Sequence, residues 1–153
     1  RRNVNLKILL FNNKIYGLTK GQYSPTSELG KVTKSTPMGS LDFPFNPLSL
    51  AIGAEATFVA RSIDTDKAGT TSVLRAAAEH KGTAFVEIFQ NCPIFNDDAW
   101  AFVRDDKEGV NRIVLKHGEP IRWGPGGERG LRQRADGSIE VCAGDAPDVL
   151  VHD

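Results

Sequence analysis

Apolar residues in the first hundred positions gather in short runs that alternate with segments of helical character. Residues 4–11 form an apolar run without clean alternation, which is typical of a strand buried on both faces of a parallel sheet. Further strands are predicted at 57–61 and 84–89, and helices at 48–53 and 67–80. This order of elements predicts an α/β domain with a parallel sheet.

Two regions of the chain lack such periodicity. Residues 14–46 are rich in Gly, Ser, Thr and Pro, which in a compact domain indicates a functional loop. Beyond residue 97, glycines punctuate short polar segments, and we expect an irregular tail rich in β-hairpins, with a hairpin turn at residues 124–127. The charged run 104–109 suggests a boundary, so that residues 1–106 would be a partial domain and 107–153 an extension.

Composition narrows the class of protein. With 19 basic and 19 acidic residues the net charge is zero, so nothing favours nucleic acid or an anionic membrane as a partner. No apolar run is long enough to cross a bilayer, and a cytoplasmic location is the default. Cys92 and Cys142 are too few and too separate for a disulfide framework, which leaves free thiols or a metal role.

Polar residues follow the first and the last predicted strands directly. Asn12 and Asn13 come after the first, and Cys92 follows the strand at 84–89. Ligands of open α/β sheets bind beyond the carboxyl ends of the strands, which share one edge. We therefore expect Asn12, Asn13 and Cys92 to lie close together.

The residues after the first strand suit a diphosphate and its metal ion. Asparagine and backbone oxygens are ligands that Mg²⁺ accepts, and the glycines at 17 and 21 let the backbone turn closely. Taken alone, however, Asn12 and Asn13 are better explained as an Asx-type turn than as a metal site. By the same standard, a lone Cys92 is more often a small buried apolar residue than a ligand.

The longer motif weighs against those simpler readings. Residues 12–22 read Asn-Asn-Lys-Ile-Tyr-Gly-Leu-Thr-Lys-Gly-Gln and continue with Tyr-Ser-Pro-Thr-Ser. This run, together with Phe-Val-Glu-Ile-Phe-Gln-Asn-Cys at 85–92, resembles the β subunits of 2-oxoacid:ferredoxin oxidoreductases. The resemblance covers most of residues 3–97 and implies the C-terminal half of a thiamine-diphosphate-binding parallel-sheet domain.

The resemblance also implies which residues bind cofactors. Asn13 and the Ile15 carbonyl correspond to Mg²⁺ ligands, with Asn12 reduced to a turn residue, and Cys92 corresponds to one ligand of a [4Fe-4S] cluster. The implied thiamine-diphosphate contacts are Asn13, Ile15, Tyr16, Gly17, Leu18 and Thr19. The Gly-Asp-Gly and Cys-x-x-Cys segments that complete both sites in the family are missing here, so we expect a truncated chain that binds neither cofactor well by itself.

Substrate preference is predicted from Leu18 and Lys20, the candidate residues of the substrate pocket. Pyruvate-specific relatives usually carry Asn at the position of Leu18, so an apolar residue favours a longer 2-oxoacid such as 2-oxoglutarate. Lys20 is a candidate partner for a carboxylate or phosphate. The alternative interpretation, that Lys20 is an exposed loop lysine with no such role, is nearly as well supported.

The activity implied by the resemblance is oxidative decarboxylation of a 2-oxoacid to acyl-CoA and CO₂, with thiamine diphosphate as electron sink. The implied partners are an α subunit in a heterodimer, ferredoxin and coenzyme A. A non-redox thiamine enzyme is an alternative that would have no use for Cys92. A non-catalytic nucleotide-binding or subunit-interaction module is another, and a flavodoxin-like protein is a third. Cys142, His80, His117 and His152 lack any motif and are read as structural.

Overall fold

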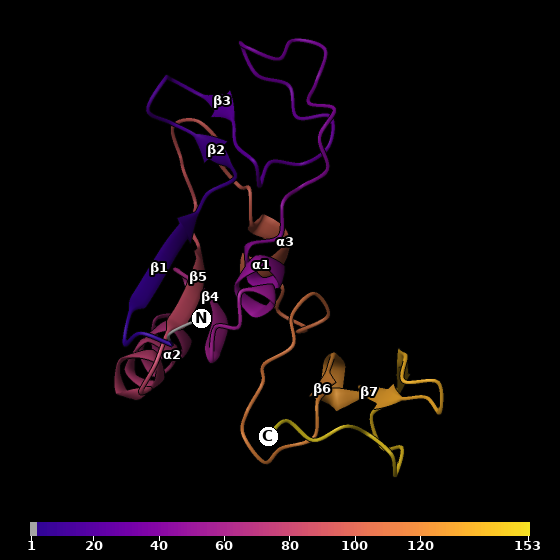
Figure 1. Ribbon diagram of the computed structural model, residues 1–153. Helices are drawn as coiled ribbons and strands as arrows, with labels where there is room; N and C mark the ends of the chain where they lie inside the picture. The colour runs from indigo at the N-terminus through magenta and orange to yellow at the C-terminus, as the bar shows by residue number, and fades with distance from the viewer. Residues whose placement is uncertain (1–2) are drawn as a thin grey trace. The chain divides into compact units, whose positions relative to one another are not determined.

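The computed structural model describes residues 3–153, in two compact units (Figure 1). The residues up to Trp100 form unit 1, which contains β1 (Lys7–Asn12), β2 (Ile15–Tyr16), β3 (Gln22–Tyr23), α1 (Pro47–Gly53), β4 (Phe58–Ile63), α2 (Lys67–Glu79) and β5 (Ala84–Phe89). Residues 101–153 form unit 2, with α3 (Ala101–Arg104), β6 (Arg122–Trp123), the 3₁₀ helix η1 (Pro125–Gly127), β7 (Arg129–Gln133) and β8 (Ile139–Ala143). The units divide shortly before the boundary suggested near residues 104–109.

A three-stranded parallel sheet organises unit 1. Its strand order is β1-β5-β4, and the register pairs Asn12 with Phe89 and Ile63 with Phe89 at the carboxyl ends. The strands and helices predicted between residues 48 and 89 are all present, with ends shifted by one or two residues. The fold class is therefore α/β, as predicted.

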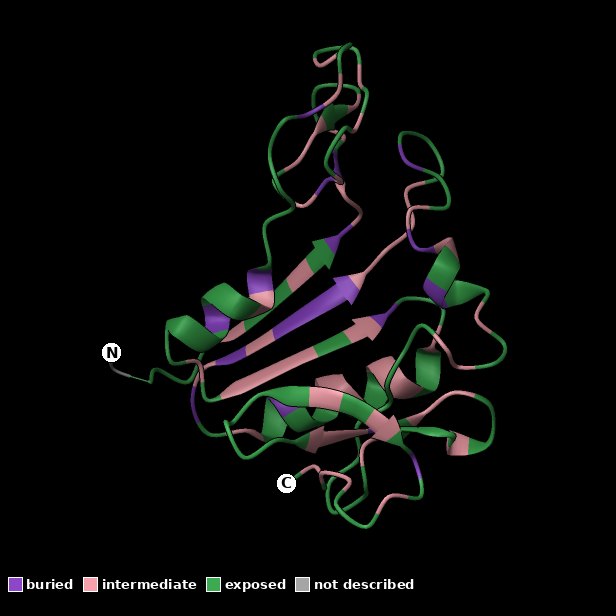
Figure 2. Ribbon diagram, turned by 90° about the vertical axis from the view of Figure 1, so that its right-hand side faces the viewer, coloured by how far each residue is buried: buried purple, intermediate pink, exposed green. Residues whose placement is uncertain are grey.

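The burial of the first strand differs from the prediction of a strand buried on both faces. β5 is the central strand and is largely buried, whereas β1 pairs on one side only and lies at the edge of the described sheet (Figure 2). Leu9 and Phe11 are 45% and 59% exposed. An unbroken apolar run does not distinguish an edge strand from a central one, because both can be rich in apolar residues.

The two helices of unit 1 lie on opposite faces of the sheet (Figure 1). α2 covers the face of Ala84, Val86 and Ile88, where Ala77 completes the buried core. Asp66 caps α2 by accepting a hydrogen bond from the Gly69 amide at 2.9 Å. On the other face, α1 and the sheet line a largely apolar cavity described below.

Within the glycine-rich segment 14–46 the structure contains a small hairpin that the sequence did not predict. β2 and β3 pair antiparallel, with Ile15 opposite Tyr23. The strands have two residues each, too short for any apolar period to reveal. This hairpin carries the motif residues 16–21 at its tip.

Unit 2 is an antiparallel sheet in the order β6-β7-β8. The turn predicted at residues 124–127 is present, since η1 joins β6 to β7 and Arg122 pairs with Gly130. Cys142 lies in β8, opposite Gly130. Among residues 3–153, no helix has the length and apolar character needed to cross a membrane.

Candidate cofactor site

The two motifs predicted to meet do meet at the carboxyl edge of the sheet. The Gln90 amide donates to the Asn12 carbonyl at 3.0 Å, which extends the β1–β5 pairing into both following loops. The Asn96 side chain then donates from Nδ2 to the Asn13 carbonyl at 2.9 Å. The loop after β1 and the loop containing Cys92 are thus joined directly, as the sheet-edge argument required.

Asn12 is a structural residue whose side chain is fully engaged. Its Oδ1 accepts from the Lys14 amide at 3.1 Å, which is an Asx turn, and from Thr26 Oγ1 at 2.7 Å. Its Nδ2 donates to Glu87 Oε1 at 2.7 Å. Asn12 therefore has no free oxygen for a metal ion, in agreement with its assignment to the turn.

Glu87 is the buried carboxylate at the centre of this arrangement. It is 1% exposed and lies on β5, where a single unpaired charge would be strongly destabilising. Arg61, its cross-strand neighbour on β4, supplies the counter-charge, with Nε donating to Glu87 Oε2 at 2.8 Å. The Asn12–Glu87–Arg61 chain therefore ties the loop after β1 to all three strands of the sheet.

Aromatic stacking strengthens the same edge. The rings of Phe89 and Trp100 are stacked with centroids 3.5 Å apart and an interplanar angle of 8°. Arg61 lies over Phe89, and Lys14 Nζ lies 3.9 Å from the Trp100 ring centroid, so each ring faces a cation. Trp100 Nε1 also donates to the Asn12 carbonyl at 2.8 Å. These contacts explain why unit 1 extends to Trp100.

Of the two predicted Mg²⁺ ligands, Ile15 is 6% exposed and pairs with Tyr23 in β2, whereas Asn13 lies nearer the surface. Asn13 is half-buried, and its Oδ1 accepts one long hydrogen bond from the Ile15 amide at 3.3 Å, so a lone pair remains. The described residues contain no group of three or more His, Cys, Asp or Glu side chains arranged for a metal. An ion bound at Asn13 would thus take its other oxygens from diphosphate, water or further protein groups, as Mg²⁺ commonly does.

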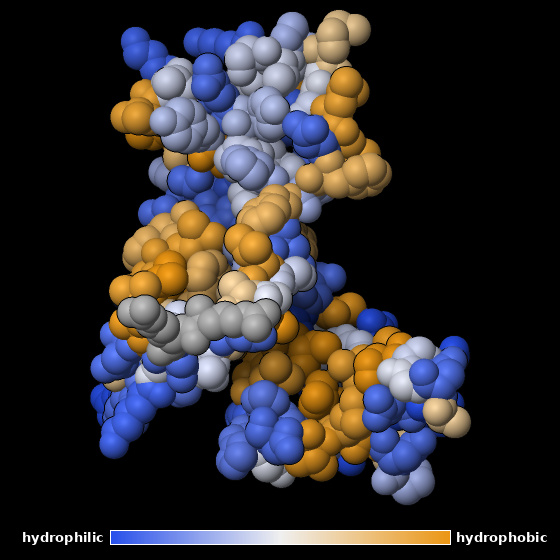
Figure 3. All heavy atoms as spheres, viewed as in Figure 1, coloured by the Kyte–Doolittle hydropathy of each residue, from blue (hydrophilic) through white to orange (hydrophobic). Residues whose placement is uncertain are grey.

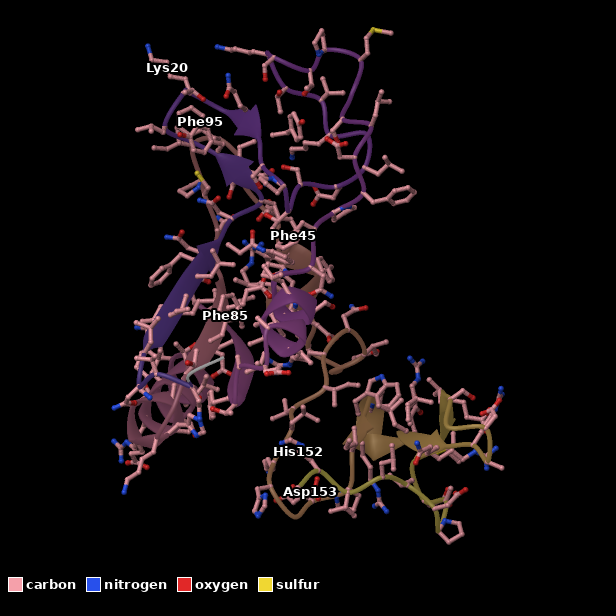
Figure 4. All side chains as sticks on the ribbon, in the orientation of Figure 1. Lys20, Phe45, Phe85, Phe95, His152 and Asp153 are labelled. Atoms are coloured by element: carbon pink, nitrogen blue, oxygen red, sulfur yellow. The ribbon has the colours of Figure 1, made fainter. Side chains whose placement is uncertain are left out.

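The hairpin tip presents the remaining motif residues. The Lys20 amide donates to the Gly17 carbonyl at 3.0 Å and closes a turn, while Tyr16, Leu18, Thr19 and Lys20 are exposed. Gly21 has a φ of +96°, and a Cβ there would lie 3.2 Å from Phe95. The backbone conformation therefore favours glycine, and a larger residue would also press on Phe95, three residues after Cys92 in the chain (Figure 4).

Cys92 lies in a tight turn beside this hairpin. Its carbonyl accepts from the Asn96 amide at 2.9 Å, and its thiol is free and partly exposed. A partly exposed thiol fits a cluster ligand better than a buried apolar residue. Cys142 belongs to unit 2, so the described part of unit 1 offers one thiolate, and the other three ligands of a [4Fe-4S] cluster would come from elsewhere.

A cavity of about 880 Å³ lies beside Asn13. β1 and α1 contribute Ile8, Leu10 and Ala51 to its apolar wall, and apolar side chains gather at the surface over this region (Figure 3). Polar groups line it where β1 ends, at Asn12, Asn13 and Thr26. The volume lies in the range of cofactor sites.

The segment after the hairpin is fastened to the Asn13 loop by hydrogen bonds and one ion pair. Ser27 Oγ donates to the Lys14 carbonyl at 2.6 Å, and Lys14 Nζ lies 2.9 Å from Glu28 Oε1. Burial alone would raise the pKa of the Glu28 carboxyl. Its hydrogen bonds from Lys14 and the backbone, and the charges of Lys14 and Lys31, outweigh burial and lower that pKa below its ordinary value.

This lowered pKa predicts an acid-sensitive loop. A carboxyl whose folded pKa is depressed stabilises the fold above its unfolded pKa, and that contribution disappears as the pH falls through the folded pKa. We expect residues 24–46 to loosen as the pH falls below about 4, the ordinary carboxyl range. Hydrogen exchange of this segment, corrected for intrinsic pH dependence, would measure it.

Glu28→Gln should remove most of that pH-dependent step, since the neutral amide cannot titrate. Glu79→Gln, at an exposed glutamate of α2, is the matched control and should leave the step intact. An identical acid transition in Glu28→Gln would show that another group controls the loop.

Sequence reasoning missed four residues of this site: Arg61, Glu87, Asn96 and Trp100. Glu87 was noticed only as part of the motif at 85–92. A charged residue within a predicted central strand was the one available signal, because such a residue needs a buried partner. Nothing in the local sequence marked Asn96 or Trp100.

A comparison of the sequence with models of known protein families identifies the family of this chain. Residues 1–88 match the family model "Thiamine pyrophosphate enzyme, C-terminal TPP binding domain". The chain therefore belongs to the thiamine-pyrophosphate enzymes, through the family's C-terminal cofactor-binding domain.

Within that class the chain is similar to β subunits of 2-oxoacid oxidoreductases. It is 60% identical to 2-oxoglutarate oxidoreductase subunit KorB of Mycobacterium tuberculosis, over all of this chain and 42% of that protein. It is 41% identical to the 2-oxoacid:ferredoxin oxidoreductase subunit beta of Saccharolobus solfataricus, over 82% of this chain and 39% of the other.

A solved structure also resembles it. The 2-oxoglutarate:ferredoxin oxidoreductase from Magnetococcus marinus, with 2-oxoglutarate, coenzyme A and succinyl-CoA bound, superposes with a TM-score of 0.65 at 42% identity. The match covers 69% of this chain and 36% of that one. The chain thus spans about two fifths of the length of the curated relatives described above.

Proposed function

We propose that this chain forms part of the β subunit of a 2-oxoacid:ferredoxin oxidoreductase that acts on 2-oxoglutarate. The reaction would be oxidative decarboxylation to an acyl-CoA and CO₂, with electrons passing through a [4Fe-4S] cluster to ferredoxin. Membership of the thiamine-pyrophosphate family and the similarity to 2-oxoacid oxidoreductase β subunits support this proposal.

The observation that carries the redox part of the proposal is the meeting of the Asn13 and Cys92 loops. A non-redox thiamine enzyme would need the first loop but would have no use for a cysteine next to it. Here Asn96 binds the carbonyls of both Asn13 and Cys92, so the two loops are held at a fixed spacing. Short spacing is what electron transfer from the cofactor to a cluster requires.

Each motif residue then has a distinct role. Asn13 and the Ile15 carbonyl would bind Mg²⁺, and the turn formed by Tyr16, Gly17, Leu18 and Thr19 would surround the cofactor. Cys92 would bind iron. Thiamine diphosphate, when bound, supplies the electron sink for decarboxylation, and the protein supplies its position and surroundings.

The proposed assembly is a heterodimer with an α subunit in the cytoplasm. Ferredoxin, coenzyme A and the 2-oxoacid complete the set of partners. The α subunit is inferred from the names of relatives that are β subunits, and coenzyme A from the ligands named with the Magnetococcus structure. Neither nucleic acid nor a membrane has a place in this proposal.

Leu18 and Lys20 are proposed to influence substrate choice. Both are exposed on the hairpin tip, and Figure 4 shows Lys20 projecting from it. Leu18 is 83% exposed, so it is available to contact a substrate or another subunit. An apolar residue there leaves no amide to bind a short oxoacid, which favours 2-oxoglutarate over pyruvate.

The test is ferredoxin reduction by the assembled oxidoreductase. We expect reduction that depends on coenzyme A and is faster with 2-oxoglutarate than with pyruvate. Leu18→Asn should raise the ratio of kcat/KM for pyruvate to that for 2-oxoglutarate by about tenfold, the scale of one specific contact. Leu115→Asn, an exposed position in unit 2, should leave the ratio unchanged.

Two results would count against these assignments. Decarboxylation without any reduction of ferredoxin would indicate a non-redox thiamine enzyme. An unchanged substrate ratio in Leu18→Asn would remove Leu18 from the substrate pocket while leaving the overall activity standing.

A further inference from the structure

Asn96 occupies an unusual place between the two cofactor loops. It is 7% exposed, although it lies in the loop after β5, where its neighbours Phe95 and Asp97 are exposed. Burial of an amide is unfavourable unless its polar atoms are satisfied. The hydrogen bonds that satisfy the buried Asn96 amide therefore indicate the role of this residue.

Those contacts reach three separate segments. The backbone amide donates to the Cys92 carbonyl at 2.9 Å, and Nδ2 donates to the Asn13 carbonyl at 2.9 Å. Oδ1 accepts from Lys31 Nζ at 2.5 Å. A single residue thus connects three segments: its backbone binds the Cys92 turn, and its side chain binds the Asn13 loop and the 24–46 segment.

We infer that Asn96 is a positioning residue that couples the Mg²⁺–diphosphate loop to the cluster cysteine. When the Asn13 carbonyl moves, it displaces the Asn96 side chain that is bound to it. The Asn96 backbone amide, which binds the Cys92 carbonyl, then moves as well. Binding of the cofactor at Asn13 would then alter the surroundings of the Cys92 sulfur. This inference rests on the proposed function, because it requires both cofactors to bind.

Gln90 also joins the two loops, through its backbone amide on the Asn12 carbonyl, but the neighbouring side chains of the Cys92 loop make different contacts. Phe95 packs against Gly17 and Gly21, but an apolar contact is not directional and so does not fix the position of one loop atom against another, as a hydrogen bond does. Asn91 lies in the same loop, yet its side chain bonds only within it, donating to Asp97 Oδ1 and accepting from the Asp98 amide. Asn91 is therefore a matched control of the same residue type.

The test uses Asn96→Asp in the assembled oxidoreductase. The variant keeps the size of the side chain and the acceptor for Lys31 but replaces the donor to the Asn13 carbonyl by a carboxylate oxygen. We expect affinity for thiamine diphosphate at limiting Mg²⁺ to fall about tenfold, within the range seen when a metal ligand loses its hydrogen-bonded support. Asn91→Asp adds the same charge to the same loop, opposite the Asp97 carboxylate, and because the Asn91 side chain binds Asp97 and Asp98 and not the Asn13 loop, affinity should be unchanged.

The decisive readout is the EPR spectrum of the reduced cluster. In the unmodified enzyme, addition of Mg²⁺ and thiamine diphosphate should shift the cluster signal, and this shift should persist in Asn91→Asp. In Asn96→Asp, measured at cofactor saturation, the shift should be lost. A residue needed only for folding would lower the melting temperature without removing a shift at full occupancy.

The results of these experiments distinguish a failure of this inference from a failure of the proposed function. If the unmodified enzyme binds neither cofactor, the proposed function fails. If it binds both and Asn96→Asp keeps the full EPR shift and the full affinity, the coupling role of Asn96 is wrong and the proposed function stands. If Asn96→Asp fails to assemble, Lys31→Met provides a second test, because it removes the hydrogen bond from Lys31 to Asn96 Oδ1. We expect this variant to weaken the EPR shift. An undiminished shift in Lys31→Met would overturn the inference.

Discussion

Replacing Cys92 by serine in the assembled oxidoreductase is expected to abolish electron transfer to ferredoxin while leaving thiamine-diphosphate binding largely intact. Serine is a poor ligand for iron in such clusters, so the [4Fe-4S] centre would be lost or converted to a smaller species. The Cys92 carbonyl, which accepts from Asn96, is retained in the variant, so the Asn13 loop should keep its position. Low-temperature EPR and ferredoxin reduction measure the two effects.

Cys142→Ser is the control for this experiment. Cys142 is the other cysteine of the chain and lies in β8 of unit 2. We expect its replacement to leave the cluster signal and the turnover rate unchanged. An unaltered cluster signal in Cys92→Ser would refute the ligand role of Cys92.

Replacing Asn13 by alanine should have the opposite pattern, with loss of cofactor affinity and retention of the cluster. Removal of Oδ1 takes away one proposed Mg²⁺ ligand, and the loss should be on the order of a hundredfold in affinity at limiting Mg²⁺. Excess Mg²⁺ should restore part of the binding, because the Ile15 carbonyl and the diphosphate oxygens remain. Titration of thiamine diphosphate at several Mg²⁺ concentrations measures this.

Asn5→Ala removes an exposed asparagine ahead of β1 and should leave the cofactor titration unchanged. The Asn13 carbonyl survives in the alanine variant, so its hydrogen bond to Asn96 should persist and the EPR signal of the cluster should be present. Equal affinity in Asn13→Ala and the unmodified enzyme would exclude Asn13 as the metal ligand.

Much of the candidate site could be predicted because parallel strands impose a simple rule. Asn13 and Cys92 follow different strands, and the carboxyl ends of those strands meet at one edge. The rule needs only the order and direction of the strands, which apolar patterning supplies. It predicted that the two loops converge, but it could not specify the contact that joins them.

Strand position within the sheet was not predictable in the same way. The apolar run of β1 suggested burial on both faces, yet Leu9 and Phe11 are 45% and 59% exposed, and in the described sheet β1 lies at one edge and β5 is the central strand. Glu87 lies in that central strand, and its burial depends on Arg61 and on Asn12, which is 75 residues away in the chain. Local patterning cannot identify a partner so distant.

Apolar patterning and local motifs were enough to predict the α/β alternation, to find the motif between residues 12 and 22, and to support the family resemblance that implies Asn13, Ile15 and Cys92 as ligands. Folding was needed to reveal that the Asn12 side chain is fully occupied by hydrogen bonds with Glu87, Thr26 and Lys14, and that Asn96 and Trp100 bind the loop after β1. Periodicity records which face of an element is buried, whereas these hydrogen bonds join side chains and carbonyls 83 and 88 residues apart. Their partners are fixed when the strands pair, and no local spacing encodes them.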